Sequence, residues 1–193
     1  MVMPATARPW TREMVLALPD DGNRYELLDG ELLVTPAPTW RHQAAAAAVF
    51  RRIDPYVRAT RVGVAGFAPA DLALEGGQVA QPDVFVIPLR PDGRPPRVWE
   101  EFRIPLLVVE ILSPSTAQKD RMVKRRRYQR TGVAEYWVVD LDSRMIERWR
   151  PGDERPEILD GELSWQPDPL HPALIFVLAD LFEEVPDLPA PGQ

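Results

Sequence analysis

The chain contains no cysteine among its 193 residues, which excludes structural disulfides, thiolate zinc sites and cysteine nucleophiles. Histidine is almost as rare, with His42 and His171 as the two examples, so a histidine-based catalytic triad has little support. No stretch approaches the roughly 20 consecutive apolar residues of a membrane span. The first residues also lack the apolar centre of a signal peptide. We therefore expect a cytoplasmic protein.

Length and composition predict one globular domain. A chain of 193 residues falls within the usual range for a single domain. Its 45% hydrophobic content is typical of soluble globular proteins. We expect the domain to cover residues 10–185, and the segments 1–9 and 186–193 to be flexible tails.

Positive charge is concentrated in one segment of an acidic protein. The formal net charge is −6, which argues against a dedicated nucleic-acid coat protein. Residues 116–131, however, carry seven cations and one anion, so this segment has a charge of +6 and the rest of the chain −12. The basic segment could contact phosphate groups, or it could pair with acidic neighbours in the same fold.

Two turn motifs predict β-hairpins. Asp29-Gly30 and Asp160-Gly161 are each flanked by short strand-forming runs, and Asp-Gly is among the strongest short-range hairpin signals. The strand pairs that they predict are 25–28 with 31–35, and 157–160 with 162–165. The two motifs have similar flanking residues because they share the same turn chemistry.

The longer runs predict helices and buried strands. The alanine-rich run 39–58 predicts one helix, and the basic segment predicts another that ends at Gly132. The apolar runs 84–87 and 106–112 predict strands that are covered on both faces. Residues 136–149 predict a further strand pair. The pattern as a whole predicts a mixed α/β domain, with helices against a central sheet and additional hairpins.

Two carboxylates lie on or beside the buried strands. Glu110 is within the strand 106–112, which has no other polar side chain, and period-two alternation places it on the same face as Val108. A buried carboxylate is costly unless it is paired or binds a metal ion, and one of the 21 arginines could be its partner. Asp83 opens the other buried strand, which by itself is ordinary turn chemistry. Together, two carboxylates at adjacent strand ends would suit Mg²⁺ or Mn²⁺.

The basic helix and the first hairpin add further candidates. The chain has only two lysines, both in the basic helix, so Lys124 could mark a place that needs a compact charge or a shiftable pKa. It could also belong to a solvated basic face. Asp120, Lys124 and Tyr128 share one face of this helix. Glu26 could supply another acid, and His42 could face either the site or the solvent.

These residues occur in a recognisable order. The segments that carry it are Tyr25-Glu26-Leu27-Leu28-Asp29-Gly30-Glu31-Leu32, His42, Pro82-Asp83-Val84, Val109-Glu110-Ile111-Leu112-Ser113-Pro114-Ser115, Asp120, Lys124, Tyr128, Gly132-Val133 and Glu135-Tyr136-Trp137-Val138-Val139-Asp140. From about Trp10 to Phe182 the chain resembles the Uma-two family of putative restriction endonucleases, a domain of unknown function within the PD-(D/E)xK nuclease superfamily. The resemblance implies a restriction-endonuclease-like fold, with a central mixed β-sheet flanked by helices.

The resemblance also implies catalytic roles. Asp83 and Glu110 would be metal ligands, and Glu26 would assist them. The superfamily places its lysine two residues after the acid, but that position is Leu112 here, so the role would pass to Lys124. The implied reaction is phosphodiester hydrolysis assisted by Mg²⁺ or Mn²⁺, in which Lys124 would orient the attacking water or stabilise developing charge.

A nucleic acid, with DNA expected, is the implied partner. Tyr128, Arg127 and His42 would contact it, largely through phosphate. The alternatives are a catalytically silent or partner-dependent module that binds nucleic acid or protein on the same fold, and a metal-dependent hydrolase of small phosphorylated substrates. Trp149 and Trp165, expected to be exposed, could supply a homodimer interface together with the additional hairpins.

Overall fold

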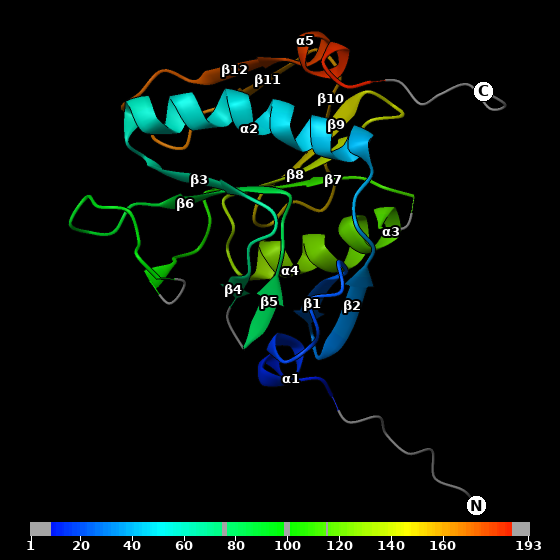
Figure 1. Cartoon of the computed structure of the whole chain (residues 1–193). Helices are drawn as coiled ribbons and strands as arrows, with labels where there is room; N and C mark the ends of the chain where they lie inside the picture. Colours follow the sequence, from blue (N-terminus) through cyan, green and yellow to red (C-terminus); the bar gives the residue numbers. More distant parts are fainter. Residues whose placement is uncertain (1–8, 75–76, 99–100, 115, 187–193) are drawn as a thin grey trace, which may run out of the picture.

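The computed structural model describes residues 9–74, 77–98, 101–114 and 116–186. The expected tails 1–9 and 186–193 therefore lie almost entirely outside the described residues. Helix α2 (Trp40–Thr60) covers one face of the central sheet. A small second sheet and the helix built from α3 and α4 cover the other face (Figure 1). Within the described ranges, no helix combines the length and the apolar character needed to cross a membrane.

The central sheet has six strands and mixed direction. Its spatial order is β10-β9-β8-β7-β6-β3. The pair β7–β8 is parallel, and the other neighbouring pairs are antiparallel. The strands are β3 (Gly63–Phe67), β6 (Val84–Pro88), β7 (Leu107–Ile111), β8 (Glu135–Asp140), β9 (Met145–Trp149) and β10 (Glu157–Leu159). The expected α/β fold with a central mixed sheet flanked by helices is confirmed.

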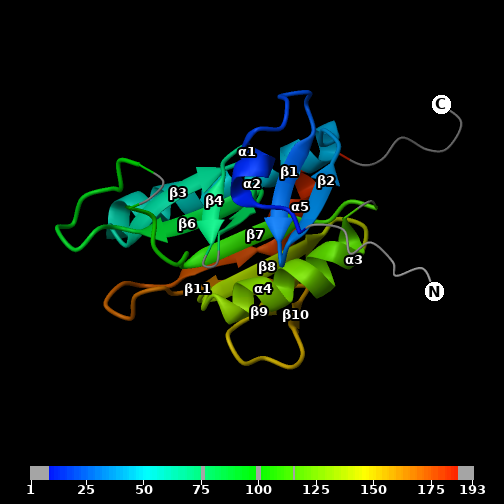
Figure 2. The same cartoon turned by 90° about the horizontal axis from the view of Figure 1, so that it is seen from below.

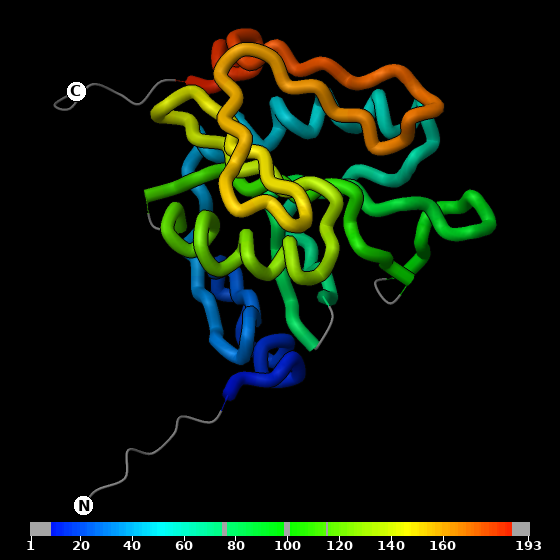
Figure 3. The backbone as a smooth tube through the Cα atoms, turned by 180° about the vertical axis from the view of Figure 1, so that it is seen from behind, coloured from blue at the N-terminus to red at the C-terminus, as the bar shows by residue number. Residues whose placement is uncertain are grey.

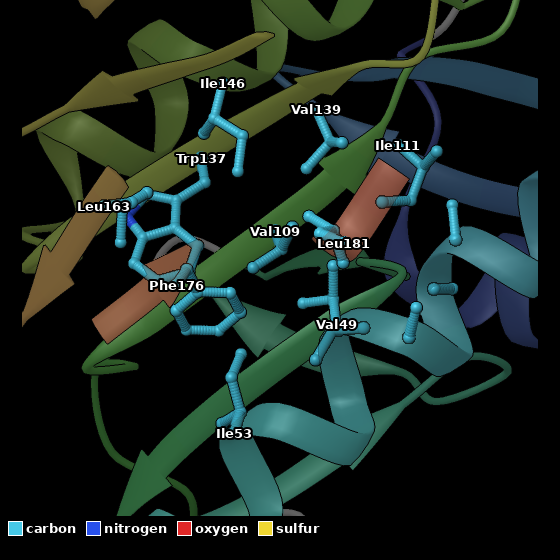
Figure 4. Packing of buried hydrophobic residues seen from close by; sticks show 14 of the residues in the cluster. Val49, Ile53, Val109, Ile111, Trp137, Val139, Ile146, Leu163, Phe176 and Leu181 are labelled. Atoms are coloured by element: carbon cyan, nitrogen blue, oxygen red, sulfur yellow. The ribbon is translucent and has the colours of Figure 1, made fainter. Parts of the chain in front are cut away.

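Helix α2 and the sheet enclose the larger hydrophobic core. Thr39 caps the helix by accepting a hydrogen bond from the amide of His42. Figure 4 shows Val49 and Ile53 of this helix facing Val109 of β7 across the core. Because strand side chains alternate between faces, the neighbours of Val109 along β7 point to the opposite side of the sheet.

The opposite face is covered by the small sheet and the basic helix, as the view from below shows (Figure 2). The predicted hairpin around Asp29-Gly30 is confirmed, and it pairs with two more strands in the order β2-β1-β5-β4. The elements on this side are α1 (Arg12–Leu16), β1 (Arg24–Leu28), β2 (Glu31–Thr35), β4 (Leu72–Leu74), β5 (Gln78–Ala80), α3 (Ala117–Lys119), η2 (Asp120–Lys124) and α4 (Arg125–Arg130). The basic helix ends before Gly132, whose φ of 80° favours glycine.

The predicted hairpin around Asp160-Gly161 is wrong. Strand β10 extends the central sheet beside β9, whereas β11 (Glu162–Trp165) pairs with β12 (Leu174–Val177) in a separate two-stranded sheet. The chain passes from one sheet to the other over this turn (Figure 3). In the separate sheet, Leu163 and Trp165 are buried in the larger core together with residues of helix α5 (Leu178–Glu183).

The expected exposure of two tryptophans is also wrong. Trp165 is 1% exposed because it packs edge-on against Trp137 in the larger core. Trp149 is 7% exposed, and the guanidinium of Arg125 lies 4.6 Å from its ring centroid. These two side chains therefore provide no surface for a homodimer.

Candidate active site

Asp83 lies immediately before β6 and is held by three donors. It is 3% exposed. Its Oδ1 accepts a hydrogen bond from Arg24 at 2.6 Å. Its Oδ2 lies 3.1 Å from His42 Nε2 and accepts the amide of Ile111 at 2.8 Å. The bond from Ile111 ties Asp83 to strand β7, which carries Glu110.

Strand register makes Asp83 and Glu110 neighbours. In the antiparallel pair β6–β7, Val84 lies opposite Val109. Asp83, which precedes Val84, and Glu110, which follows Val109, are therefore next to each other at the same end of this antiparallel pair. Val84 and Val109 belong to the core under α2, so alternation directs both carboxylates to the opposite face, where the basic helix lies.

Glu110 is the acceptor of a buried network that joins three parts of the fold. Its Oε1 lies 3.1 Å from Lys124 Nζ and accepts the hydroxyl of Tyr128 at 3.1 Å. Lys124 Nζ also lies 2.8 Å from Oε2 of Glu26 on strand β1. The other oxygen of Glu26 accepts the amide of Gln81 at 2.8 Å. A single ammonium thus connects the central sheet, the basic helix and the small sheet.

Asp120 is a fourth carboxylate of this cluster, and it is absent from the set of site residues expected from the sequence. It is 1% exposed, and its Oδ1 lies 3.5 Å from Lys124 Nζ. This oxygen has no hydrogen-bond partner among the described residues. Asp120 and Lys124 begin and end a π-helical turn, a feature found frequently at functional sites. Their spacing of four was the sequence signal for this contact.

Environment separates the pKa values of the two central carboxylates. Burial opposes ionisation of Asp83, but the hydrogen bond and charge of His42, the charge of Arg24 and the Ile111 amide outweigh it and lower the pKa of Asp83 to about 2. Burial raises the pKa of Glu110 well above its ordinary value. The charge of Lys124 opposes this rise, while the charge of Asp83 adds to it.

The pKa of Lys124 moves in the direction that keeps its charge. Burial lowers this pKa, but the charges of Glu110, Glu26 and Asp120 outweigh burial and raise it well above the ordinary lysine value. Lys124 is therefore a permanent cation within the cluster. It does not have the lowered pKa that a catalytic lysine base would need.

The cluster contains more acidic than basic side chains. Four carboxyl groups (Glu26, Asp83, Glu110 and Asp120) share it with two permanent cations, Arg24 and Lys124, so full ionisation would leave an excess of negative charge that a divalent cation would balance. Carboxylate oxygens are ligands that Mg²⁺ and Mn²⁺ prefer. Among the described residues, no three His, Asp or Glu side chains are arranged to hold a metal ion together. Asp83 and Glu110 offer oxygen ligands of the type that Mg²⁺ takes, while both oxygens of Asp83 already contact Arg24, His42 and the Ile111 amide.

A cavity of about 570 Å³ gives access to part of this cluster. Asp83, Glu110 and Asp120 line it, together with His42 and Arg24. Two further arginines, Arg41 and Arg121, also line it. The remaining lining residues include Leu112, Ser113, Asp140 and Ser143. The cavity therefore opens onto the carboxylates, and its three arginines, Arg24, Arg41 and Arg121, are each ion-paired with one of the acids that line it.

The other expected site residues lie at different depths. His42 lines the cavity, with its Nδ1 buried and without a hydrogen-bond partner among the described residues. Tyr128 is 0% exposed and lies behind Glu110, and Lys124 and Glu26 are likewise behind the cavity wall. Arg127 lies 3.6 Å from Asp29, on the small-sheet side. The structure thus brings most of the expected residues together but separates Arg127 from the cavity.

Arg24 is the functional candidate that the sequence did not single out. It lines the cavity and makes the 2.6 Å ion pair with Asp83. Nothing in the sequence distinguishes it from the other 20 arginines except its place two residues before Glu26, on the same face of strand β1.

Comparison with known proteins places this geometry in context. A family model described as "Putative restriction endonuclease" (Uma2) matches residues 12–179. A crystal structure of a putative nuclease belonging to DUF820 from Anabaena variabilis is similar, with a TM-score of 0.70 and 23% sequence identity. The similarity covers 92% of this chain and 99% of that chain. No curated protein matches the sequence.

Proposed function

Because the chain belongs to the Uma2 family, described as "Putative restriction endonuclease", we propose that it is a metal-dependent endonuclease that hydrolyses phosphodiester bonds in DNA. The observation that supports this most directly is the pair Asp83 and Glu110, adjacent on one face of the sheet and both open to the same cavity. The similar structure from Anabaena variabilis, itself described as a putative nuclease, supports the same fold.

A divalent cation held by Asp83 and Glu110 would stabilise charge on the scissile phosphate and lower the pKa of a bound water. Arg24 and His42 fix the orientation of Asp83 through its two oxygens. They also place positive or hydrogen-bonding groups at the cavity wall, where a phosphate oxygen would lie.

The buried residues act through Glu110. Lys124 and Tyr128 both contact Oε1 of Glu110, so they fix its position and favour its ionised form. Glu26 and Asp120 hold Lys124 from two other sides. In this proposal Lys124 and Tyr128 are positioning residues, which differs from the direct contacts with water and phosphate expected from the sequence.

The test is cleavage of plasmid and single-stranded DNA in Mg²⁺ and in Mn²⁺ by wild type and Glu110→Gln. The matched control is Glu162→Gln, the same change at an exposed position of strand β11. We expect wild type and the control to cut DNA, and Glu110→Gln to lose at least ~100-fold, because one ligand of the catalytic ion is gone.

Equal cleavage by wild type and Glu110→Gln would overturn the assignment of the site. Absence of cleavage by the wild type, with DNA binding retained, would favour the alternative of a silent or partner-dependent binding module. Activity on a small phosphodiester that exceeds activity on DNA would point to a hydrolase of small substrates.

A further inference from the structure

A second, smaller pocket shares a wall with the candidate active site. Its volume is about 150 Å³, and Arg24 and Asp83 line both this pocket and the larger cavity. Asp83 and its ion-pair partner therefore separate the two spaces. A ligand in the smaller pocket would therefore lie next to a ligand bound at Asp83 in the larger cavity.

One wall of the small pocket is a face of helix α2. Gln43, Ala46, Ala47 and Phe50 follow one another at the spacing of a single helical face. The two alanines leave the space open, because larger side chains at these positions would fill it. Gln43 and Ala47 are exposed, so the pocket opens to solvent along this face.

The opposite wall carries an exposed aromatic ring. Phe67, the last residue of strand β3, is 58% exposed and lies 4.9 Å from Phe50, centroid to centroid, in an edge-to-face arrangement. An aromatic ring left this open beside a polar site is a common platform for a flat ligand. Arg51, at the pocket rim, is a cation that forms an ion pair with Glu184 at 2.7 Å.

These features fit an unpaired nucleobase. The pocket has room for one ring system, the phenyl rings offer stacking, and the Gln43 amide offers both a donor and an acceptor for a base edge. The shared wall at Asp83 places such a base one step from the phosphate in the larger cavity. An apolar side chain from a protein would gain nothing from the adjoining cations.

We propose that this pocket, called the base pocket below, binds one unpaired base of the nucleic acid whose neighbouring phosphate lies at Asp83 and Glu110. The proposal rests on the proposed nuclease function and deepens it. A base stacked within a duplex cannot enter the pocket, so the preferred substrate is single-stranded or carries an extruded base at the cleavage position.

The test uses binding without cleavage. Fluorescence anisotropy would measure the affinity of a labelled single strand, its duplex and a single strand with abasic residues, with Ca²⁺ in place of Mg²⁺. The proteins are wild type, Ala47→Phe, which fills the base pocket, and Ala59→Phe. Ala59 is exposed on the same helix and lines none of the pockets described, so it controls for the new aromatic side chain.

We expect wild type to bind the single strand about 10-fold or more tightly than the abasic strand or the duplex, since one stacked base contributes an effect of that order. Ala47→Phe should lose this preference while binding the abasic strand normally, and Ala59→Phe should keep it. Thermal melting of both variants establishes that they are folded. Phe67→Trp should also keep the preference, because stacking is preserved.

Equal affinity of wild type and Ala47→Phe for the single strand would overturn the base pocket. Failure of wild type to bind any oligonucleotide would overturn it too, and would favour a side chain of a protein partner as the occupant. The proposed function fails separately: a wild type that prefers base-bearing strands but cuts none in Mg²⁺ or Mn²⁺ keeps the base pocket and loses the nuclease activity.

Discussion

Lys124 and Glu26 form an ion pair of 2.8 Å that joins the basic helix to the first hairpin, and their side chains are only 5% and 2% exposed. Two such elements, distant in sequence, are usually joined by apolar packing. Here a charge pair also joins them, and the same ammonium contacts Glu110 and Asp120. The stability of the small sheet and the geometry of the candidate site therefore depend on one side chain.

Removal of this ammonium should destabilise the fold. Lys124→Met leaves buried carboxylates without their cation, which costs about 3–5 kcal/mol when one partner of a buried pair is removed. The matched control is Lys119→Met, the same change at the other lysine, which is only half-buried; it should stay within about 0.5 kcal/mol of wild type. Urea denaturation measures both, and equal losses would contradict the role given to Lys124.

Metal binding should be linked to proton release. The raised pKa of Glu110 means that its carboxyl retains a proton to higher pH, so a metal ion bound at Glu110 would have to displace that proton. Affinity for Mn²⁺ should therefore rise with pH. Calorimetric titration in two buffers of different ionisation enthalpy measures the protons released. A wild type whose affinity is the same at all pH values would refute this link, and Glu110→Gln should remove it.

The loss of unfolding free energy at acidic pH should depend on Asp83. Its pKa is lowered from 3.8 to about 2 in the folded protein, so the unfolded chain binds this proton more tightly. The stabilisation is thus fully present above the unfolded pKa and is lost as the pH falls toward about 2. Asp83→Asn should flatten this part of the curve of unfolding free energy against pH. The exposed Asp20→Asn should leave the curve unchanged, and an identical effect of both changes would count against the proposal.

The separate two-stranded sheet should contribute to the stability of the larger hydrophobic core, which contains Leu163. Leu163 is 0% exposed, whereas Leu170, in the loop that follows β11, is 86% exposed. Leu163→Ala should lose about 2–5 kcal/mol of unfolding free energy, as buried leucines do. Leu170→Ala should change it by less than about 0.5 kcal/mol. Similar small effects at both positions would mean that β11 is not part of the cooperative core.

Local signals were sufficient for much of the fold. Thr39 and the alanine run define the start and body of α2, and Asp29-Gly30 defines the first hairpin, because capping and turn chemistry act over a few residues. The same kind of signal gave a wrong prediction at Asp160-Gly161, where no hairpin forms. The chain bends there, but the strands on either side join different sheets, and Leu163 is buried.

The sequence by itself determined that Glu110 would share a face of its strand with Val108, since alternation along a strand is a local property, but which helix covers that face was decided by the tertiary structure. The sequence also determined that Asp120 and Lys124 would be neighbours on one helix. Only the tertiary structure decided which partner each carboxylate has. Twenty-one arginines are chemically equivalent candidates in the sequence, and the choice of Arg24 for Asp83 follows from how the small sheet packs on the central one. Burial, which sets the pKa of Glu110, likewise exists only once these layers have come together.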